Sequence, residues 1–307
     1  MKIGFLFGGQ GAQFVGMGQD MAEHDAEIKA IFEQADNIMG TSLSDIMFHS
    51  ERIHETLYAQ PALFTFGAAM LEKLKAAGIE SEGSAGLSLG EFLAYYDAGG
   101  FTFSQGLETV IHRAFYMDET AKTSQTKMVA LLGKKAAALQ LAESIEGCEV
   151  ANFNGPNQTV IGCKADQVDD VIQNAASYGI KRAQPIQTAA AFHTSYMNPA
   201  AKGFKTYLQY IQVNDPNKPL YGNTTGRLIE EDLKTTMIKQ ITTPVQFHTM
   251  IESMVDDGFD TFIEISPKAT LKPLVKKIAP ALTVYTVTDI ESLDTCISAL
   301  KGRHENV

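Results

Sequence analysis

Ser88 lies in the pattern Gly86-Leu87-Ser88-Leu89-Gly90, and small residues spaced this way around a serine are typical of a nucleophile elbow. In such an elbow a strand turns sharply into a helix, and the serine hydroxyl points outward at the helix N-terminus. The helix end and the amide of Leu89 would then stabilise negative charge on a reacting carbonyl oxygen. Ordinary glycine–serine loops also produce this pattern, so the chemistry requires a base elsewhere in the chain.

His193 is the candidate base, in the segment Ala-Ala-Ala-Phe-His-Thr-Ser at residues 189–195. A single histidine is more often structural than catalytic. No acidic residue follows in a position that completes a Ser-Asp-His order. If His193 acts as the base, we expect a backbone carbonyl to orient its imidazole in a looser form of the triad.

A glycine-rich loop, Gly-Gly-Gln-Gly-Ala-Gln at residues 8–13, follows the apolar run Ile3–Phe7. Its glycines allow the backbone to approach a ligand closely, and its amides would line an oxyanion hole. A simple turn from a strand to a helix also favours glycine. The loop does not match the glycine spacing and downstream acid of a dinucleotide-binding site.

The cysteine, histidine and charge content excludes several classes of function. Three cysteines, at positions 148, 163 and 296, are odd in number and widely spaced. This argues against a disulfide framework and against a zinc site with C-x-x-C spacing. The seven histidines form no H-x-x-x-H pair, so we expect no metal. A net charge of −11 disfavours nucleic acid as a partner.

The hydrophobic segments of the chain are short. None approaches the roughly 20 apolar residues that a membrane-spanning helix needs. The first ten residues, MKIGFLFGGQ, lack a secretory signal pattern and are better interpreted as a first buried strand. We therefore expect no membrane association and a cytoplasmic location.

Alternating strands and helices predict an α/β fold. Ile3–Phe7 and Thr261–Ile265 are short apolar runs typical of buried parallel strands. Helical periodicity is present over residues 26–39. Pro61 is expected as the first residue of a helix that ends at Gly78. The prediction is a large α/β-hydrolase-like catalytic domain with a parallel sheet, made of residues 1–126 and 189–307.

A different pattern occupies residues 127–188. The predicted order is strand, helix, strand, strand, helix, strand, and it matches a ferredoxin-like unit. We interpret this segment as a small domain inserted into the larger one. The predicted elements are a strand at 128–132, a helix at 135–145, strands at 149–152 and 159–163, a helix at 165–177 and a strand at 181–187.

Several longer motifs stand in a characteristic order along the chain. They are FGGQGAQFVGMG near the start, YAQPAL at 58–63, GLSLGEF at 86–92, HRAFYM at 112–117, ANFNGPNQTVIG at 151–162, AAFHTSYM at 190–197 and TTPVQF at 242–247. This collinear set resembles the malonyl-CoA:acyl carrier protein transacylases of fatty-acid synthesis, from residue 1 to about residue 280. The set is much more specific than any single motif in it.

The resemblance implies a role for each candidate residue. Ser88 would be the nucleophile and His193 the general base, while the amides of Gln10 and Leu89 would form the oxyanion hole. Arg113 would pair with the malonyl carboxylate, because its planar guanidinium suits bidentate binding of a carboxylate. Further implied roles are a main-chain carbonyl that orients the histidine at Gln240, a malonyl-selective position at Phe192, and a pocket position at Gln60.

Three departures from the family pattern stand out. Leu87 replaces the histidine that commonly precedes the nucleophile, which bears on acyl selectivity. Gly8 stands where proline is usual, and residues 264–271 depart from the usual Gly-Pro-Gly-Lys. None of the three positions is Ser88, His193 or Arg113.

The resemblance implies an S-malonyltransferase that moves malonyl from malonyl-CoA to the phosphopantetheine thiol of acyl carrier protein. The reaction would pass through a malonyl-serine and supply fatty-acid synthesis. Coenzyme A thioester would be a substrate, and no cofactor would be bound permanently. Alternatives are a trans-acting malonyl transferase of a polyketide pathway, a serine esterase or thioesterase, and a non-catalytic module that docks carrier protein.

Overall fold

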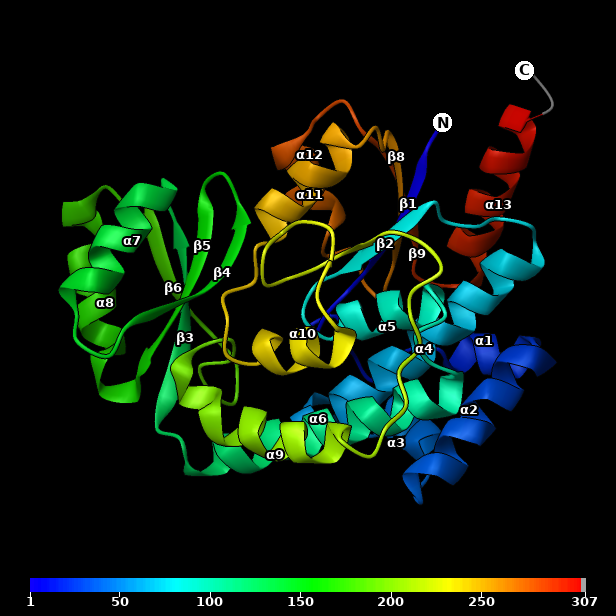
Figure 1. Ribbon diagram of the computed structural model, residues 1–307, viewed down its shortest axis with the longest axis horizontal. Coiled ribbons are helices and arrows are strands. Elements are labelled where there is room, and N and C mark those ends of the chain that lie inside the picture. The colour runs from blue at the N-terminus through cyan, green and yellow to red at the C-terminus, as the bar shows by residue number, and fades with distance from the viewer. Residues whose placement is uncertain (305–307) are drawn as a thin grey trace. The chain divides into compact units, whose positions relative to one another are not determined.

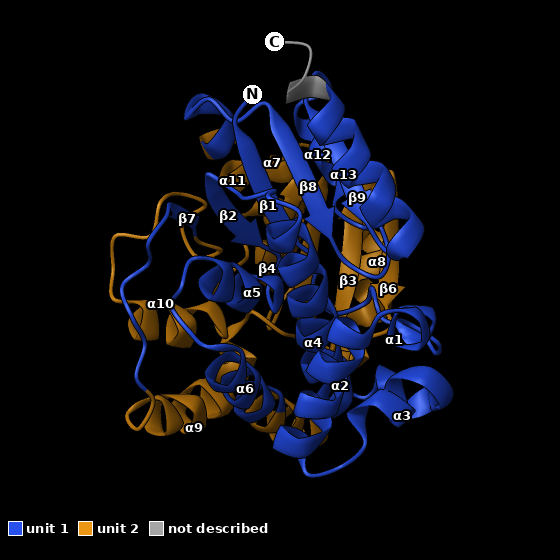
Figure 2. Ribbon diagram, turned by 90° about the vertical axis from the view of Figure 1, so that its right-hand side faces the viewer, with its two compact units in different colours: residues 1–114, 212–221, 254–307 blue, residues 115–211, 222–253 orange. Residues whose placement is uncertain are grey.

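The computed structural model describes residues 1–304, which divide into two compact units (Figure 1, Figure 2). Unit 1 consists of residues 1–114, 212–221 and the described part of 254–307. Unit 2 consists of residues 115–211 and 222–253. Among the described residues, no helix has the length and apolar character needed to cross a membrane.

Unit 1 is built on a five-stranded sheet in which every pair of neighbouring strands is parallel. The central strands β1 and β8 are buried along their whole length, as expected for a parallel sheet covered on both faces. Both strands have the bounds predicted from the sequence. In sheet order the strands are β7 (Leu220–Tyr221), β2 (Gly83–Gly86), β1 (Ile3–Phe7), β8 (Thr261–Ile265) and β9 (Thr283–Val287).

Helices surround this sheet, and α5 packs directly against β1 and β2. Helix α2 has the predicted bounds, because Asp25 caps its first amides and Gly40, with a φ of 69°, ends it. Helix α6 starts in unit 1 and continues into unit 2. The helices are α1 (Gln19–His24), α2 (Ala26–Met39), α3 (Leu43–His49), a 3₁₀ turn at Glu51–His54, α4 (Thr56–Ala76), α5 (Gly90–Asp97), α6 (Phe103–Thr123), α12 (Lys272–Ile278) and α13 (Ile290–His304).

Helix α4 corrects one prediction. It starts at Thr56, so Pro61 lies inside the helix and is not its first residue. A proline inside a helix removes one backbone hydrogen bond and crowds the preceding turn. Almost the whole length of α4 from Thr56 to Leu71 is buried, and this packing outweighs the local cost. The helix ends as predicted, just before Gly78, whose φ is 80°.

Unit 2 contains a four-stranded antiparallel sheet with two helices, in the predicted ferredoxin-like order. Its core lies between the sheet and the helices and includes Val129, Leu141, Ile161 and Val171. The elements are β3 (Thr126–Leu132), α7 (Lys135–Ser144), β4 (Glu149–Gly155), β5 (Gln158–Lys164), α8 (Val168–Ala175) and β6 (Arg182–Ile186), with sheet order β4-β5-β3-β6.

The rest of unit 2 is helical, and the boundaries 127–188 predicted for the small domain stay a prediction. The compact unit takes in those residues and groups further helices with them. Helix α11 starts in unit 2 and ends in unit 1. The further elements are the short 3₁₀ turns Ala165–Gln167, Ala176–Tyr178 and Ser195–Met197, and the helices α9 (Asn198–Leu208), α10 (Leu233–Gln240) and α11 (Phe247–Asp256).

Candidate active site

Ser88 occupies the sharp connection between β2 and α5. Its φ is 54°, in the left-handed region that a residue with a side chain rarely adopts. This backbone costs roughly 1–2 kcal/mol, and such strain concentrates at functional sites. The turn is held on both sides of the serine: Leu87 N donates to Phe7 O at 3.0 Å, and Gly90 N donates to Leu87 O at 2.9 Å. The geometry is that of a nucleophile elbow with a partly exposed hydroxyl residue.

Close backbone contacts explain the glycines of this turn. A Cβ added at Gly86 would lie 2.0 Å from the carbonyl carbon of Gly90. One added at Gly90 would lie 2.1 Å from Phe7 O. The glycine-rich loop that follows β1 is equally close, since a Cβ at Gly9 would lie 2.5 Å from Leu87 O. The elbow and the loop after β1 therefore pack backbone against backbone, in a way that no side chain would permit.

The two residues expected to form the oxyanion hole lie on these two segments. Gln10 directly follows Gly9 in the loop after β1. Leu89 is buried and directly precedes the first residue of α5. Its amide is therefore at the positive end of that helix, where developing negative charge is stabilised.

A chain of hydrogen bonds links Ser88 to the loop after β1. Arg113 donates from Nη2 to Ser88 Oγ at 3.1 Å and from Nη1 to Gln60 Oε1 at 2.6 Å. Gln60 Nε2 donates to Gln10 Oε1 at 3.4 Å, and Gln10 Nε2 donates to Thr56 Oγ1 at 3.1 Å. The structure thus brings together four of the residues singled out from the sequence and adds Thr56.

Arg113 is a buried cation, with only 1% of its surface exposed. Burial lowers the pKa of Arg113 to about 10, against the opposing influence of Glu91 and Tyr95. The guanidinium is therefore protonated near neutral pH. Its Cζ also lies 5.2 Å from the ring centroid of Phe92, within range of a cation–π interaction. A buried guanidinium that donates to a serine hydroxyl favours a substrate with a negatively charged group.

Glu91 is a site residue that the sequence analysis did not single out. It is completely buried, and Tyr95 donates a hydrogen bond to its carboxylate. Burial, followed by the charge of Glu91, raises the pKa of Tyr95 well above its ordinary value. Glu91 provides negative charge near Arg113. Glu91 follows Gly90 directly and lies four residues before Tyr95. Residues four apart are neighbours on a helix, so this spacing could have identified the pair from the sequence.

His193 lies in a tight turn of unit 2, with a φ of 61° and 3% of its surface exposed. Its Nδ1 is 2.8 Å from the main-chain oxygen of Gln240, the last residue of α10. A carbonyl only accepts hydrogen bonds, so Nδ1 carries the proton and Nε2 is left as the basic nitrogen. The negative end of α10 also favours the imidazolium that forms when Nε2 gains a proton.

Hydrogen bonds within unit 2 fix the turn around His193. Thr194 Oγ1 donates to Ala191 O at 2.6 Å, and Ala191 N donates to Thr126 Oγ1 at 3.0 Å. Glu149 at the start of β4 accepts hydrogen bonds from Ser195 N, at 2.8 Å, and from Ser195 Oγ. No local sequence pattern indicates the Glu149 contact, because the partners are 46 positions apart.

Two residues expected to affect acyl selectivity complete the set. Phe192 is buried in unit 2, with 7% of its surface exposed, and Leu87 is partly exposed in unit 1. Among residues 1–304, no cluster of three or more His, Cys, Asp or Glu side chains is arranged to hold a metal ion. Unit 1 therefore carries Ser88, Leu87, Leu89, Gln10, Gln60 and Arg113, and unit 2 carries His193, Phe192 and Gln240.

Comparison with known proteins identifies the family. Residues 4–294 match the acyl transferase domain family. The malonyl CoA-acyl carrier protein transacylase of Bacillus subtilis is 37% identical over 314 aligned positions, which cover 99% of each chain. The crystal structure of that enzyme from Clostridium perfringens has a TM-score of 0.94 and 32% identity, covering 99% of this chain and 98% of the other.

A further solved structure contains a partner. It is a malonyl-transacylase in complex with a type II PKS acyl-carrier protein, with a TM-score of 0.93 and 26% identity, covering 97% of this chain and all of the other. The family match extends over nearly the whole length of the sequence. The chain belongs to the acyl transferase domain family.

Proposed function

We propose that this acyl transferase moves the malonyl group from malonyl-CoA to the phosphopantetheine thiol of acyl carrier protein. The full-length similarity to malonyl CoA-acyl carrier protein transacylases supports this activity and a place in fatty-acid synthesis. The observation that carries the proposal is the buried Arg113, which donates a hydrogen bond to Ser88 Oγ. Arg113 puts a cation beside the nucleophile, where a malonyl thioester has its free carboxylate.

The proposed reaction has two halves with the same residues in the same roles. Ser88 Oγ attacks the thioester carbonyl while His193 Nε2 takes its proton, and the amides of Gln10 and Leu89 stabilise the oxyanion. The carbon–sulfur bond breaks, and coenzyme A leaves with the proton from His193. The carrier thiol then gives its proton to His193 and attacks the malonyl-serine ester, and Ser88 leaves as the hydroxyl. Gln240 acts through its carbonyl, which holds His193 in the required tautomer.

Arg113 supplies the selectivity in this proposal. Without substrate its two terminal nitrogens donate to Ser88 and Gln60. A malonyl carboxylate offers two acceptor oxygens to the same planar group, and its binding would release Ser88 Oγ for attack. Phe192 would crowd an α-methyl branch, so methylmalonyl-CoA is disfavoured by about 1–3 kcal/mol. Leu87 contributes apolar surface where the family commonly has histidine.

The proposed chemistry uses only groups of the chain and of its substrates. Side chains and amides provide the nucleophile, the base, the oxyanion hole and the carboxylate partner, and coenzyme A enters as a thioester. One proposed substrate is a coenzyme A thioester and the other is a carrier protein. A cytoplasmic location therefore belongs to the same proposal.

Two alternatives use the same residues. A malonyl transferase of a polyketide pathway is chemically identical, and one structural relative was solved with a type II PKS acyl-carrier protein. A serine esterase would use water in the second half-reaction in place of the carrier thiol. The esterase predicts free malonate as the main product when both carrier and water are present.

Intact-protein mass spectrometry tests the proposal. Incubation with malonyl-CoA alone should add one malonyl group, located on Ser88 by peptide mapping, and holo-carrier protein should remove it. Ser88→Ala should lose both the adduct and turnover. Turnover retained in Ser88→Ala contradicts the mechanism. Rapid release of free malonate, with no malonyl-carrier product, supports the esterase instead.

A further inference from the structure

Two of the three cysteines are brought together across the β4–β5 strand pair. In that pair Glu149 opposes Gly162, so the next antiparallel position places Cys148 opposite Cys163. Both are free thiols, and Cys148 packs against the core that contains Cys163. The odd number and wide spacing of the cysteines in the sequence argue against a disulfide framework, but this spacing does not reveal the register of the hairpin. Directly opposed antiparallel residues have Cα separations of about 4.5–5.5 Å, which is within the range that a disulfide requires.

The thiols and the His193 turn lie on opposite faces of the same two strands. Cys163 is completely buried in the core on the helix-covered face, and the partly exposed Cys148 packs against that core. Successive side chains on a strand alternate between the two faces. The neighbouring pair, Glu149 and Gly162, therefore belongs to the other face, where Glu149 holds Ser195.

Contacts on that other face join both strands to the turn that carries His193. A Cβ added at Gly162 would lie 2.6 Å from Ala191 Cβ and 2.9 Å from Thr194 Cγ2, so the strand touches the turn on both sides of His193. On the β4 side, Gly147 O accepts a hydrogen bond from Tyr196 Oη at 2.7 Å. Cys148 lies between Gly147 and Glu149, and both of these neighbours bind the segment that follows His193.

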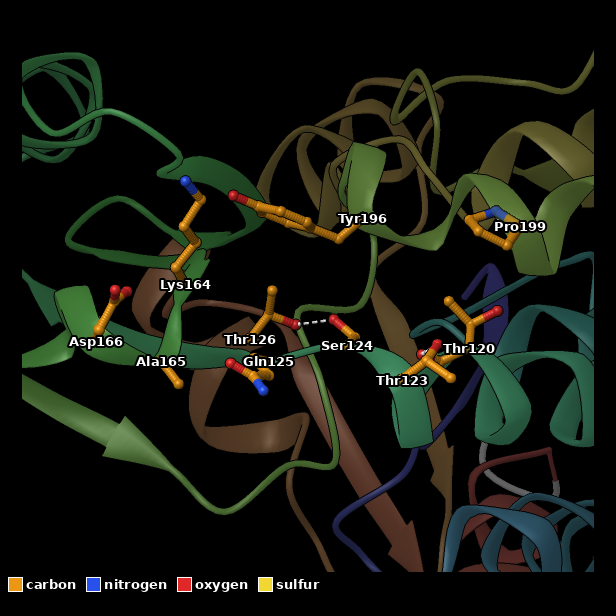
Figure 3. A pocket seen from close by; sticks show the side chains of 10 residues that line it. All are labelled: Thr120, Thr123, Ser124, Gln125, Thr126, Lys164, Ala165, Asp166, Tyr196 and Pro199. Carbon is orange, nitrogen blue, oxygen red and sulfur yellow. Dashed lines mark hydrogen bonds between the residues drawn. The ribbon is translucent and has the colours of Figure 1, made fainter.

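Cys148 is partly exposed, which gives reagents access to the pair, and a cavity that neither cysteine lines borders the end of β5. The cavity has a volume of about 430 Å³ and lies entirely within unit 2 (Figure 3). Its lining includes Tyr196 and the exposed Lys164, which directly follows Cys163. Tyr196 Oη donates to the carbonyl of Gly147, the residue before Cys148, and burial raises the pKa of Tyr196.

We propose that Cys148 and Cys163 form a redox-sensitive dithiol that a hydroperoxide converts reversibly into a disulfide, and that this disulfide shifts the His193 turn and slows malonyl transfer. The effect on transfer rests on the function proposed above. The modification itself depends only on the β4–β5 hairpin.

The oxidation balances with hydrogen peroxide as the oxidant. Cys148 is the more exposed of the two thiols and is the one that meets the peroxide. It loses its proton to solvent, and its sulfur attacks the peroxide, breaks the O–O bond and becomes a sulfenic acid. The leaving hydroxide takes up the proton that the pair lost and becomes water. Cys163 then attacks the sulfenic sulfur, the S–S bond forms, and a second water leaves.

The disulfide fixes the local geometry of the two strands. An S–S bond is about 2.05 Å long and holds its dihedral angle near ±85–100°, a constraint that two separate thiols do not impose. Drawing the sulfur atoms together moves Cys148 and Cys163 and, with them, the adjacent Gly147, Glu149 and Gly162. A misplacement of about 1 Å at a catalytic group costs roughly 10²-fold in rate. We therefore expect the oxidised protein to lose roughly 10- to 100-fold in kcat.

The test compares wild type with Cys148→Ser, with Cys148→Ala, and with Cys296→Ser as the matched control. Cys296 is buried in α13 of unit 1, and burial raises its pKa to about 12. Each folded protein is treated with hydrogen peroxide, and the disulfide is identified by peptide mass spectrometry under non-reducing conditions. Malonyl transfer to holo-carrier protein is then measured before and after dithiothreitol. Thermal unfolding of the reduced variants verifies that each is folded.

The expected result is a Cys148–Cys163 disulfide in wild type and Cys296→Ser, together with a loss of kcat that dithiothreitol restores. Both Cys148 variants should keep their activity under peroxide. The proposal is overturned if no such disulfide forms, if it forms without a change in kcat, or if the Cys148 variants are inactivated equally. Failure of the proposed function is distinguishable, because the reduced wild type would then show no malonyl transfer.

Discussion

The two units each hold one candidate catalytic side chain in a left-handed backbone conformation, but they do so by different means. Within residues 1–304, Ser88 and His193 are the non-glycine residues with a positive φ. Ser88 is fixed by steric contact, since Gly86 and Gly90 leave no space between buried backbone segments. His193 is fixed by polar contacts, chiefly the Gln240 carbonyl and the hydrogen bonds around its turn.

This difference indicates how each unit should respond to change. A Cβ about 2 Å from backbone atoms cannot be accommodated by a side-chain movement, so the elbow of unit 1 should tolerate no side chain at Gly86 or Gly90. Hydrogen bonds in a turn can lengthen or be replaced, so unit 2 should lose activity gradually as its contacts are removed. The same tolerance makes the unit 2 turn the more suitable target for a modification that adjusts the rate.

The largest effect expected from unit 2 comes from His193→Ala. Loss of a positioned acid–base group should reduce kcat for malonyl transfer by about 10²–10⁴-fold, with little change in thermal stability. Single-turnover measurements of both half-reactions are needed, because the same base serves both. Retention of wild-type kcat in either half-reaction would assign the base of that step to another residue.

Gly90→Ala tests whether steric contact fixes the backbone of Ser88. The added Cβ would lie 2.1 Å from Phe7 O, so the substitution should destabilise the fold by about 1–3 kcal/mol or more and displace Ser88. Gly155→Ala is the matched control, since a Cβ there would meet no atom within 4 Å. Urea unfolding and malonyl-serine formation are the measurements. Equal stability of the two variants would refute the steric explanation of the elbow.

The smallest effect is expected for Glu149→Gln. An amide is close in size to a carboxylate, but its oxygen forms weaker hydrogen bonds with the Ser195 backbone and hydroxyl. Weakening these bonds by about 0.5–1.5 kcal/mol predicts a fall of roughly 2- to 10-fold in kcat. The KM for malonyl-CoA should stay unchanged. A raised KM with unaltered kcat would show that Glu149 acts on substrate binding instead of on the His193 turn.

Local patterns predicted the parts of the fold that are strongly periodic or apolar. The strands Ile3–Phe7 and Thr261–Ile265 and the helix Ala26–Met39 were predicted with their observed bounds. Helix α10 was missed, because it is short and mixed in polarity. The Pro61 prediction failed because the burial of α4 outweighs a local helix signal. Tertiary packing decides where such helices begin and end, and a local sequence pattern carries no information about that packing.

The candidate site shows the same limit. Ser88 could be selected from its flanking glycines, and His193 became a candidate from its position after the ferredoxin-like unit. Thr56 and Glu149 could not be found, because their contacts join residues far apart in the sequence. The contact between Cys148 and Cys163 depends on the register of a single hairpin, which the spacing of two cysteines does not reveal.

The selectivity assigned to Arg113 is the central claim, and kcat/KM for malonyl-CoA and acetyl-CoA on wild type and Arg113→Ala tests it most directly. Loss of one partner of a buried ion pair costs roughly 3–5 kcal/mol, or some 10²–10⁴-fold. Malonyl transfer by Arg113→Ala should fall by about that factor, while acetyl transfer falls little or rises. Equal losses for the two substrates would show that Arg113 has a structural role and would contradict the proposed recognition of the malonyl carboxylate.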